Sequence, residues 1–254
     1  METIYLIIFF VFGSIMGSFY YVVATRVSKG ESIISPPSHC DNCNHKLKWY
    51  ENIPIISYLI QGGKSRCCHN KLNISYLIME VCTGMLFAVC YHVYDFTLDL
   101  LIALIFVSCM ITIIISDIEY MIILDEVLIV SSVLIIIVSL LNIGIIDTAM
   151  KILSGIGAFL TMLFIKYAGD KMFKQDSLGG GDIKMMFVVG LVLGYALSVC
   201  NIFLATFIAF PIALFLLISK KNNVIPFGPF LGMAALIIFV SGVTFTEIIT
   251  YLVS

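Results

Sequence analysis

Charged residues are scarce in this chain of 254 residues, where Asp, Glu, Lys and Arg together make up 12%. A soluble domain carries about 25% charged residues and is about half apolar, whereas this sequence is 61% hydrophobic. One globule of this length cannot bury so much apolar surface, so membrane lipid must cover the rest. A basic stripe is also missing, which argues against nucleic-acid binding. We therefore predict an all-α polytopic membrane protein.

Nucleotide-binding motifs are absent as well. Neither a G-x-x-x-x-G-K-[ST] loop nor a G-x-G-x-x-G turn after a strand occurs, so the glycine triplet at 179–181 is weak evidence for a phosphate site. A disulfide scaffold is not expected, because that inference applies to short secreted chains. Half of the eight cysteines lie singly in apolar runs, where a cysteine is usually a small buried hydrophobe. These are Cys82, Cys90, Cys109 and Cys200.

Long apolar runs dominate the sequence. A spanning helix needs about 20 mostly apolar residues, and we predict eight of them. Their ranges are 3–24, 75–93, 98–116, 127–146, 150–168, 183–198, 199–219 and 228–247. The first run lacks the basic n-region of a signal peptide, and Arg26 follows it directly, so we expect it to remain as a helix.

The basic residues are distributed unevenly among the loops between these runs. With eight spans, 13 of the 14 Lys and Arg residues fall on one side, including Lys220 and Lys221, and only Lys151 lies opposite. Because Lys and Arg are retained on the cytoplasmic side, both termini are predicted to lie outside and the loop 25–74 inside the cell.

Two acidic residues stand at the edges of apolar runs on the side predicted to be cytoplasmic. Asp117 ends the third run, and Asp182 precedes the sixth, directly after the glycine triplet. An ionisable side chain at a span end is costly to bury and is a functional candidate, although a lone Asp can equally reach interfacial water. The glycines remove every Cβ beside Asp182, so backbone or substrate can approach it closely.

The placement of the two acids predicts a shared chemistry. Although 65 residues separate them in sequence, both fall at one membrane face. Two carboxyls in a low-dielectric site resist joint ionisation and share a proton. One then acts as a base on water while the other polarises a carbonyl. Asp117 and Asp182 are therefore the predicted catalytic pair for a peptide bond. Lys184 either holds Asp182 ionised or follows the positive-inside bias.

The loop 25–74 is the longest polar stretch and is predicted to form a small subdomain. A C-x-x-C pair begins at Cys40, and a Cys-Cys-His run follows after 23 intervening residues. Two such pairs favour a structural, tetrahedral zinc site, and reduced thiols without metal are the alternative. The predicted ligands are Cys40, Cys43 and Cys68, with Cys67, His69 or His39 as the fourth.

Several separated motifs resemble the type IV prepilin peptidases, including the competence-type leader peptidases of bacteria. They run in order over most of the chain: Gly17-Ser18-Phe19 with Arg26, Pro37 to Cys43, Asn52 to Leu59, Gly63 to Cys68, Tyr76 to Glu80, Asp117, Gly179-x-Gly181-Asp182-x-Lys184, and Pro226 to Leu231. Asp117 matches the first catalytic aspartate of that family, and Asp182 matches the second, within its G-x-G-D signature. Ser65 stands where the family usually has its third loop cysteine.

The resemblance implies a membrane aspartic endopeptidase that removes a short basic leader from type IV prepilin or pseudopilin-like precursors. Cleavage is implied at the cytoplasmic face of a bacterial cell membrane, in the service of pili, secretion or DNA uptake. The resemblance further implies a six-span peptidase domain at 98–254, in which Gly179, Gly181 and Lys184 support the aspartates. The region 1–97 is implied to serve N-methylation with S-adenosylmethionine as cofactor.

Two other functions compete with this interpretation. An ion-coupled transporter would place its acids at mid-depth and would show internal hydropathy repeats, and neither feature is found. A membrane N-methyltransferase without proteolysis is the second alternative. Glu80 lies several residues inside the second apolar run, where an unpaired charge is costly, and it is a candidate for methyl transfer or for pairing with a basic group.

Overall fold

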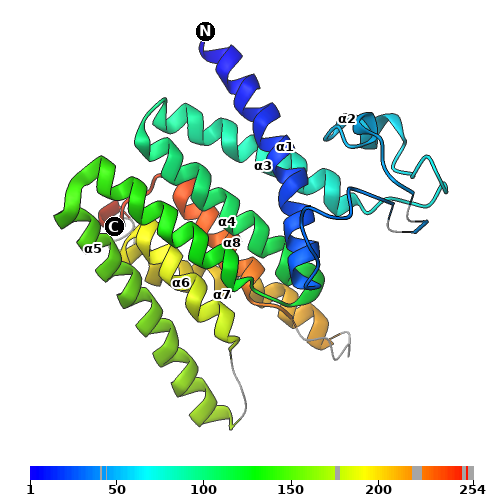
Figure 1. Cartoon of the computed structure of the whole chain (residues 1–254). Coiled ribbons are helices and arrows are strands. Elements are labelled where there is room, and N and C mark those ends of the chain that lie inside the picture. Colours follow the sequence, from blue (N-terminus) through cyan, green and yellow to red (C-terminus); the bar gives the residue numbers. More distant parts are fainter. Residues whose placement is uncertain (41, 44, 175–177, 219–224, 248–249, 251–254) are drawn as a thin grey trace. The chain divides into compact units, whose positions relative to one another are not determined.

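The computed structural model describes residues 1–40, 42–43, 45–174, 178–218, 225–247 and 250. Over these residues the chain forms eight α-helices and one short 3₁₀-helix, and no strand is found among them, which confirms the predicted all-α class. The helices group into two compact units, Met1–Phe96 and Thr97–Ser254 (Figure 1). Lys220 and Lys221, which contributed to the predicted orientation, lie outside the described residues.

The first unit is built on two long apolar helices, α1 (Glu2–Ser28) and α3 (Ile74–Tyr94). Small residues let these helices pack closely. A Cβ on Gly13 would lie 2.7 Å from the Cβ of Phe87, and a Cβ on Gly84 would lie 2.5 Å from the Oγ of Ser14. Close contact through small residues is the usual way in which membrane helices associate.

The loop between α1 and α3 contains the 3₁₀-helix η1 (Trp49–Glu51) and the short helix α2 (Ile56–Ile60). Among its described residues, only Cys40 and Ser65 are buried, so the loop has no hydrophobic core of its own. Arg26, in the last turn of α1, anchors the first part of this loop. The guanidinium donates hydrogen bonds to four backbone carbonyls, those of Ser32, Ile33, Pro36 and Pro37.

The second unit consists of the remaining helices: α4 (Leu98–Tyr120), α5 (Asp125–Phe173), α6 (Gly180–Leu193), α7 (Tyr195–Ile218) and α8 (Gly228–Ser241). Helix α4 forms its centre, since 67% of its most apolar stretch is buried, compared with 17% for α7. Helix α4 packs against α5 and α8, and α5 packs against α6. A Cβ on Gly190 would lie 2.7 Å from the Cα of Gly155, so α5 and α6 meet almost backbone to backbone.

Glycines move several predicted span boundaries. The predicted spans 127–146 and 150–168 correspond to two helical arms of α5, which meet at a sharp bend (Figure 1) where Gly144 leaves helical geometry with φ of 81° and ψ of −178°. The sixth span ends at Leu193 rather than 198, because Gly194 has φ of 78°. These conformations suit glycine, which has no Cβ to clash at positive φ.

The number of membrane crossings is the part of the prediction that the helices do not establish. Five described helices are long and apolar enough to cross: α1, α3, α4, α5 and α7. Helices α6 and α8 have 14 residues each, fewer than the roughly 20 that a full crossing requires. Helix α8 ends at Ser241, six residues before the predicted end of its span, at a left-handed Gly242. A count of eight crossings therefore stays a prediction.

Candidate active site

Asp117 and Asp182 line one cavity of about 700 Å³ in the second unit. Asp117 comes from the last turn of α4, and Asp182 comes from the first turn of α6. Each residue is only 5% exposed. Two carboxyl side chains that are far apart in sequence are thus brought to the same small space, as the sequence predicted. Burying a carboxyl is expensive, and two carboxyls buried at one cavity are candidates for a functional site.

The backbone at the ends of two helices positions Asp117. Helix α4 is capped at its C-terminal end by Met121, a left-handed residue with φ of 56°, whose N–H donates to the carbonyl of Asp117. The backbone N–H of Gly228, the first residue of α8, donates to the carboxyl group of Asp117. A Cβ on Gly228 would clash with Oδ2 of Asp117, so a glycine is required there.

Helix capping explains the placement of Asp182. Gly179 is the N-cap of α6 and Asp182 is its third residue, and the N–H of Gly179 donates back to the Asp182 carboxyl. This is one half of a capping box, and it orients the carboxyl near the positive end of the helix dipole. The other oxygen, Oδ1, is buried and has no hydrogen-bond partner among the described residues. One oxygen of Asp182 thus orients the carboxyl group, and the other has no partner among the described residues.

Gly181 allows α6 to approach the segment after α4. A Cβ on Gly181 would lie 2.6 Å from the Cβ of Ile123, whereas a Cβ on Gly180 would meet nothing within 4 Å. The glycine triplet thus contains one position at which a side chain is excluded and one at which it is tolerated.

We expect Gly181→Ala to slow the predicted peptide cleavage by roughly tenfold or more, because the clash with Ile123 displaces Asp182, one of the two predicted catalytic carboxyls, and small displacements are costly in catalysis. Gly180→Ala is the matched control. Both variants gain the same helix propensity of up to about 1 kcal/mol, so only the clash distinguishes them. Rates measured on one precursor at equal enzyme concentration would test this. Equal rates for the two variants would contradict it.

Lys184 pairs with Asp125 rather than with Asp182. Its Nζ lies 2.5 Å from Oδ2 of Asp125, and the side chains are 52% and 49% exposed, respectively. Both residues line the cavity. The first of the two predicted roles of Lys184, holding Asp182 ionised, therefore has no support in the geometry, while Asp125 has a defined ionic partner.

A substitution of Lys184 should consequently have a small effect. Exposed ion pairs contribute about 0–1 kcal/mol, so Lys184→Met is expected to change the cleavage rate by less than about tenfold. The rate of this variant relative to the unmodified protein is the measurement. A loss as large as that caused by removing the carboxyl of Asp117 or Asp182 would restore the direct role for Lys184.

The cavity also contains residues that sequence reasoning missed. Ile123, Lys166 and Phe227 line it, and Nζ of Lys166 donates to the carbonyl of Leu178 at 2.9 Å. In the sequence, Lys166 is only one of the 13 basic residues on the side predicted to be cytoplasmic. The turn-forming sequence Pro-Phe-Gly-Pro at 226–229 was the available signal that backbone, rather than side chains, shapes this wall.

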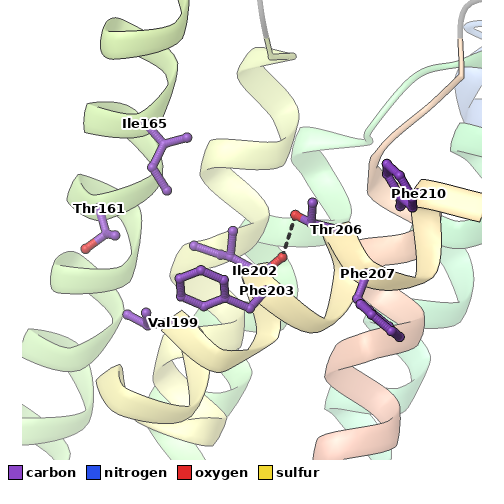
Figure 2. A pocket seen from close by; sticks show the side chains of 8 residues that line it. All are labelled: Thr161, Ile165, Val199, Ile202, Phe203, Thr206, Phe207 and Phe210. Atoms are coloured by element: carbon purple, nitrogen blue, oxygen red, sulfur yellow. Dashed lines mark hydrogen bonds between the residues drawn. The ribbon is translucent and has the colours of Figure 1, made fainter. Parts of the chain in front are cut away.

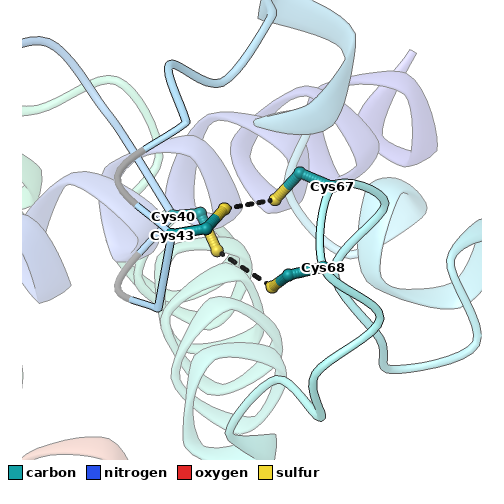
Figure 3. Close-up of side chains that lie close together, drawn as sticks. All are labelled: Cys40, Cys43, Cys67 and Cys68. Atoms are coloured by element: carbon teal, nitrogen blue, oxygen red, sulfur yellow. Dashed lines mark hydrogen bonds between the residues drawn. The ribbon is translucent and has the colours of Figure 1, made fainter.

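Four cysteines converge in the first unit, as Figure 3 shows. Two short turns carry them. One turn is closed by an antiparallel bridge between His39 and Lys46, and the other by a bridge between Lys64 and Lys71. The Sγ atoms all lie within 4.8 Å of one another, and the four residues are Cys40, Cys43, Cys67 and Cys68.

The cysteine geometry is compatible with a metal. A tetrahedral zinc with bonds of about 2.3 Å requires sulfur–sulfur distances of about 3.8 Å. Cys40 and Cys68 are separated by 3.7 Å, and Cys43 and Cys67 by 3.1 Å. Among the fourth ligands left open by the sequence, Cys67 is the one that belongs to the cluster, and neither His39 nor His69 joins it within the described chain.

Ser65 lies at the edge of the cluster and hydrogen-bonds to two of its thiols. It is 4% exposed, and its Oγ lies 3.4 Å from the sulfur of Cys40 and 2.9 Å from that of Cys67. The hydrogen bond with Ser65 is the main reason why the pKa of the Cys40 thiol falls to about 6. The neighbouring thiol of Cys67 raises the pKa of Cys43 to about 12. The cluster thus favours a thiolate at Cys40, the form that binds metal.

Glu80 stabilises a strained turn, and no basic residue is among the described hydrogen-bond partners of its carboxyl group. Its Oε2 accepts a hydrogen bond from the N–H of Ile55 at 2.7 Å, and Ser18 donates to the same carboxyl group. Ile55 has φ of 62° and ψ of −55°, and the N–H of Ile56 donates to the carbonyl of Pro54 at 2.6 Å. This is the rare γ-turn with positive φ, which is strained for a β-branched residue.

A second cavity, of about 500 Å³, lies between α5 and α7 (Figure 2). Phe203, Phe207 and Phe210 line it together with aliphatic and threonine side chains. None of its lining residues is ionisable. This cavity therefore offers no acid–base chemistry, in contrast to the cavity of the two aspartates.

Two stretches of the chain match described protein families. Residues 11–94 match the bacterial peptidase A24 N-terminal domain, and residues 104–214 match the type IV leader peptidase family. The prepilin leader peptidase/N-methyltransferase of Bacillus subtilis is 32% identical over 238 residues, which cover 92% of this chain and 94% of that protein. The chain belongs to the type IV leader peptidase family.

Other relatives of this leader peptidase carry the same description. The protein of Vibrio cholerae is 29% identical over 259 residues, covering 95% of this chain and 98% of the relative. The protein of Myxococcus xanthus is 32% identical over 190 residues, and the match spans 75% of this chain and 56% of the relative. No solved structure matches. The predicted family and the predicted peptidase class are confirmed, and the transporter alternative is wrong.

Proposed function

We propose that this leader peptidase is an aspartic endopeptidase whose catalytic pair is Asp117 and Asp182. The observation that carries the proposal is the convergence of the two carboxyls, each 5% exposed, in one cavity. The unpartnered Oδ1 of Asp182 supports it, because a buried carboxyl oxygen without a partner is costly unless a reactant binds there.

The proposed reaction needs only water and the two carboxyls. One carboxylate takes a proton from a water molecule as its oxygen attacks the scissile carbonyl carbon. The other carboxyl, protonated, donates its proton to the carbonyl oxygen. The tetrahedral intermediate then loses its C–N bond. The first carboxyl gives its proton to the departing amine nitrogen, and the second carboxylate takes a proton from a hydroxyl of the intermediate as the new carbonyl forms. The pair ends with one proton, as it began, so the cycle balances.

We infer that the substrates are prepilin-like precursors cut at the cytoplasmic face. The relatives from Bacillus subtilis and Vibrio cholerae are named for prepilin leaders. A basic leader joined to an apolar helix would place its scissile bond at the edge of the bilayer. Asp117 and Asp182 come from helix ends that face one cavity, which suits a bond at such a boundary.

Membranes containing the enzyme, incubated with a candidate precursor, provide the test. Sequencing the N-terminus of the product identifies the bond that is cut. The proposal expects a single cut at the junction of leader and apolar segment. A precursor left intact by active membranes, or cut at several unrelated bonds, would contradict the assignment.

We propose N-methylation of the new N-terminus as a second activity, by analogy with the names of the relatives. S-adenosylmethionine would supply the methyl group. Glu80 is the acid that the sequence suggests for this step. Its carboxyl group accepts hydrogen bonds from Ile55 and Ser18, so it fits a structural role better than a role in methyl transfer. Supplying a precursor that is already cut, with labelled cofactor, separates methylation from cleavage.

We propose that the four-cysteine cluster holds a structural zinc. Four thiolates are a common ligand set for closed zinc sites, and the four sulfur atoms lie within 4.8 Å of one another. Zinc would cross-link two turns of a loop in which only Cys40 and Ser65 are buried among the described residues. It would take no part in the peptide cleavage.

A further inference from the structure

We propose that the loop between α1 and α3 docks on the headgroup region of an anionic lipid bilayer through one face of α2, hereafter the α2 face. This surface consists of Ile56, Leu59 and Ile60, which are 55%, 63% and 68% exposed. The spacing i, i+3 and i+4 places them on the same side of the helix. Docking of this surface does not depend on the peptidase chemistry.

The opposite side of α2 is already occupied. Tyr58 lies against Gly63, where a Cβ would be 3.1 Å from the Tyr58 hydroxyl. The residue before the helix, Ile55, is held by Glu80. Three large apolar side chains therefore point away from the loop, while its interior contacts use the other face. Apolar side chains grouped in this way usually mark a binding surface.

The anchor at Glu80 sets the depth of α2. Glu80 is six residues into α3, which corresponds to about 9 Å along the helix. Helix α3 is one of the helices that are long and apolar enough to cross the membrane. Because Ile55 bonds to Glu80 directly, α2 starts beside the first turns of a membrane helix. A lipid surface is therefore the partner closest to α2.

Aromatic and basic residues flank this segment. Trp49 and Tyr50 contact each other edge to face with centroids 5.7 Å apart, and Trp49 is 80% exposed. Lys48 and Arg66 lie 5.8 Å and 5.5 Å from the centre of the Tyr50 ring. The loop 25–74 contains seven Lys and Arg residues and three acidic residues. Trp and Tyr favour the membrane interface, and a basic excess favours anionic headgroups.

Trp49 makes the proposal measurable, because it is the only tryptophan of the chain. The full-length enzyme is reconstituted in vesicles of phosphatidylcholine and phosphatidylglycerol. We expect lipids brominated near the headgroup end of the acyl chain to quench its fluorescence and aqueous iodide to quench it weakly. Strong iodide quenching without lipid quenching would overturn the proposal. So would protection from both quenchers, which would indicate that protein covers the loop.

Variants connect the signal to the α2 face. Leu59→Asn with Ile60→Asn should lose most of the lipid quenching and gain iodide quenching. Ile34→Asn is the matched control, since Ile34 is 90% exposed in the same loop but outside α2, and it should behave as the unmodified protein. An unchanged trypsin digestion pattern shows that the loop remains folded. Replacing phosphatidylglycerol with phosphatidylcholine should weaken lipid quenching, and no change would overturn the anionic preference.

Discussion

Replacing Asp117 or Asp182 with Asn is expected to slow precursor cleavage by roughly 10²- to 10⁴-fold, the usual contribution of a general acid or base. Asn keeps the shape of the side chain and can still accept a hydrogen bond from Gly228 or Gly179. The loss would therefore come from the missing proton chemistry. The double variant should be no slower than either single variant, because residues that act as a unit are not additive.

Glu119→Gln is the control for these variants. It makes the same acid-to-amide change two residues from Asp117, on an exposed residue that does not line the cavity. Cleavage by Glu119→Gln should match that of the unmodified enzyme. If Asp117→Asn and Asp182→Asn also cleave at the unmodified rate, the aspartic mechanism is wrong. Methylation of a pre-cut precursor should persist in both variants.

The sequence predicted the two aspartates because polar residues at the edge of apolar runs are visible without a structure. It could not predict the partner of Lys184. Asp125 is 59 residues away, and only the packing of α5 against α6 brings the two together. The interpretation of Lys184 as a neighbour of Asp182 relied on closeness in sequence, which at a helix start says little about which way a side chain points.

Backbone conformation accounts for the other differences. Apolar runs predict the two arms of α5, but they do not show that the single residue Gly144 separates these arms. Nor could a pattern of residue types predict Ile55 at φ of 62°, because β-branched residues avoid that region. Its conformation depends on Glu80, which is 25 residues away. Contacts between distant residues decided both the strained turn and the task of Glu80.

Removing one cysteine ligand is expected to abolish zinc binding and to loosen the loop between α1 and α3. Structural zinc contributes an apparent 10–16 kcal/mol in small zinc-binding peptides, and this loop has almost nothing else buried. Cys67→Ser should therefore lose the metal by native mass spectrometry and become sensitive to trypsin within the loop. Cys82→Ser, a change at an exposed lone cysteine of α3, should retain both metal and resistance. Purified unmodified protein without metal would contradict the zinc site.

The position of Ser65 allows a stricter test of the same site. Its Oγ lies 2.9 Å from the sulfur of Cys67 and 3.4 Å from that of Cys40, so a thiol at position 65 would stand at the edge of the cluster. The combined variant Ser65→Cys with Cys67→Ser should therefore regain zinc that Cys67→Ser alone has lost. If any nearby thiol could bind the metal, Cys67→Ser alone would lose little zinc. If the cluster held no metal, the double variant would gain no zinc. Recovery in the double variant alone requires four thiolates around a common centre, which is the arrangement that the two turns of this loop create.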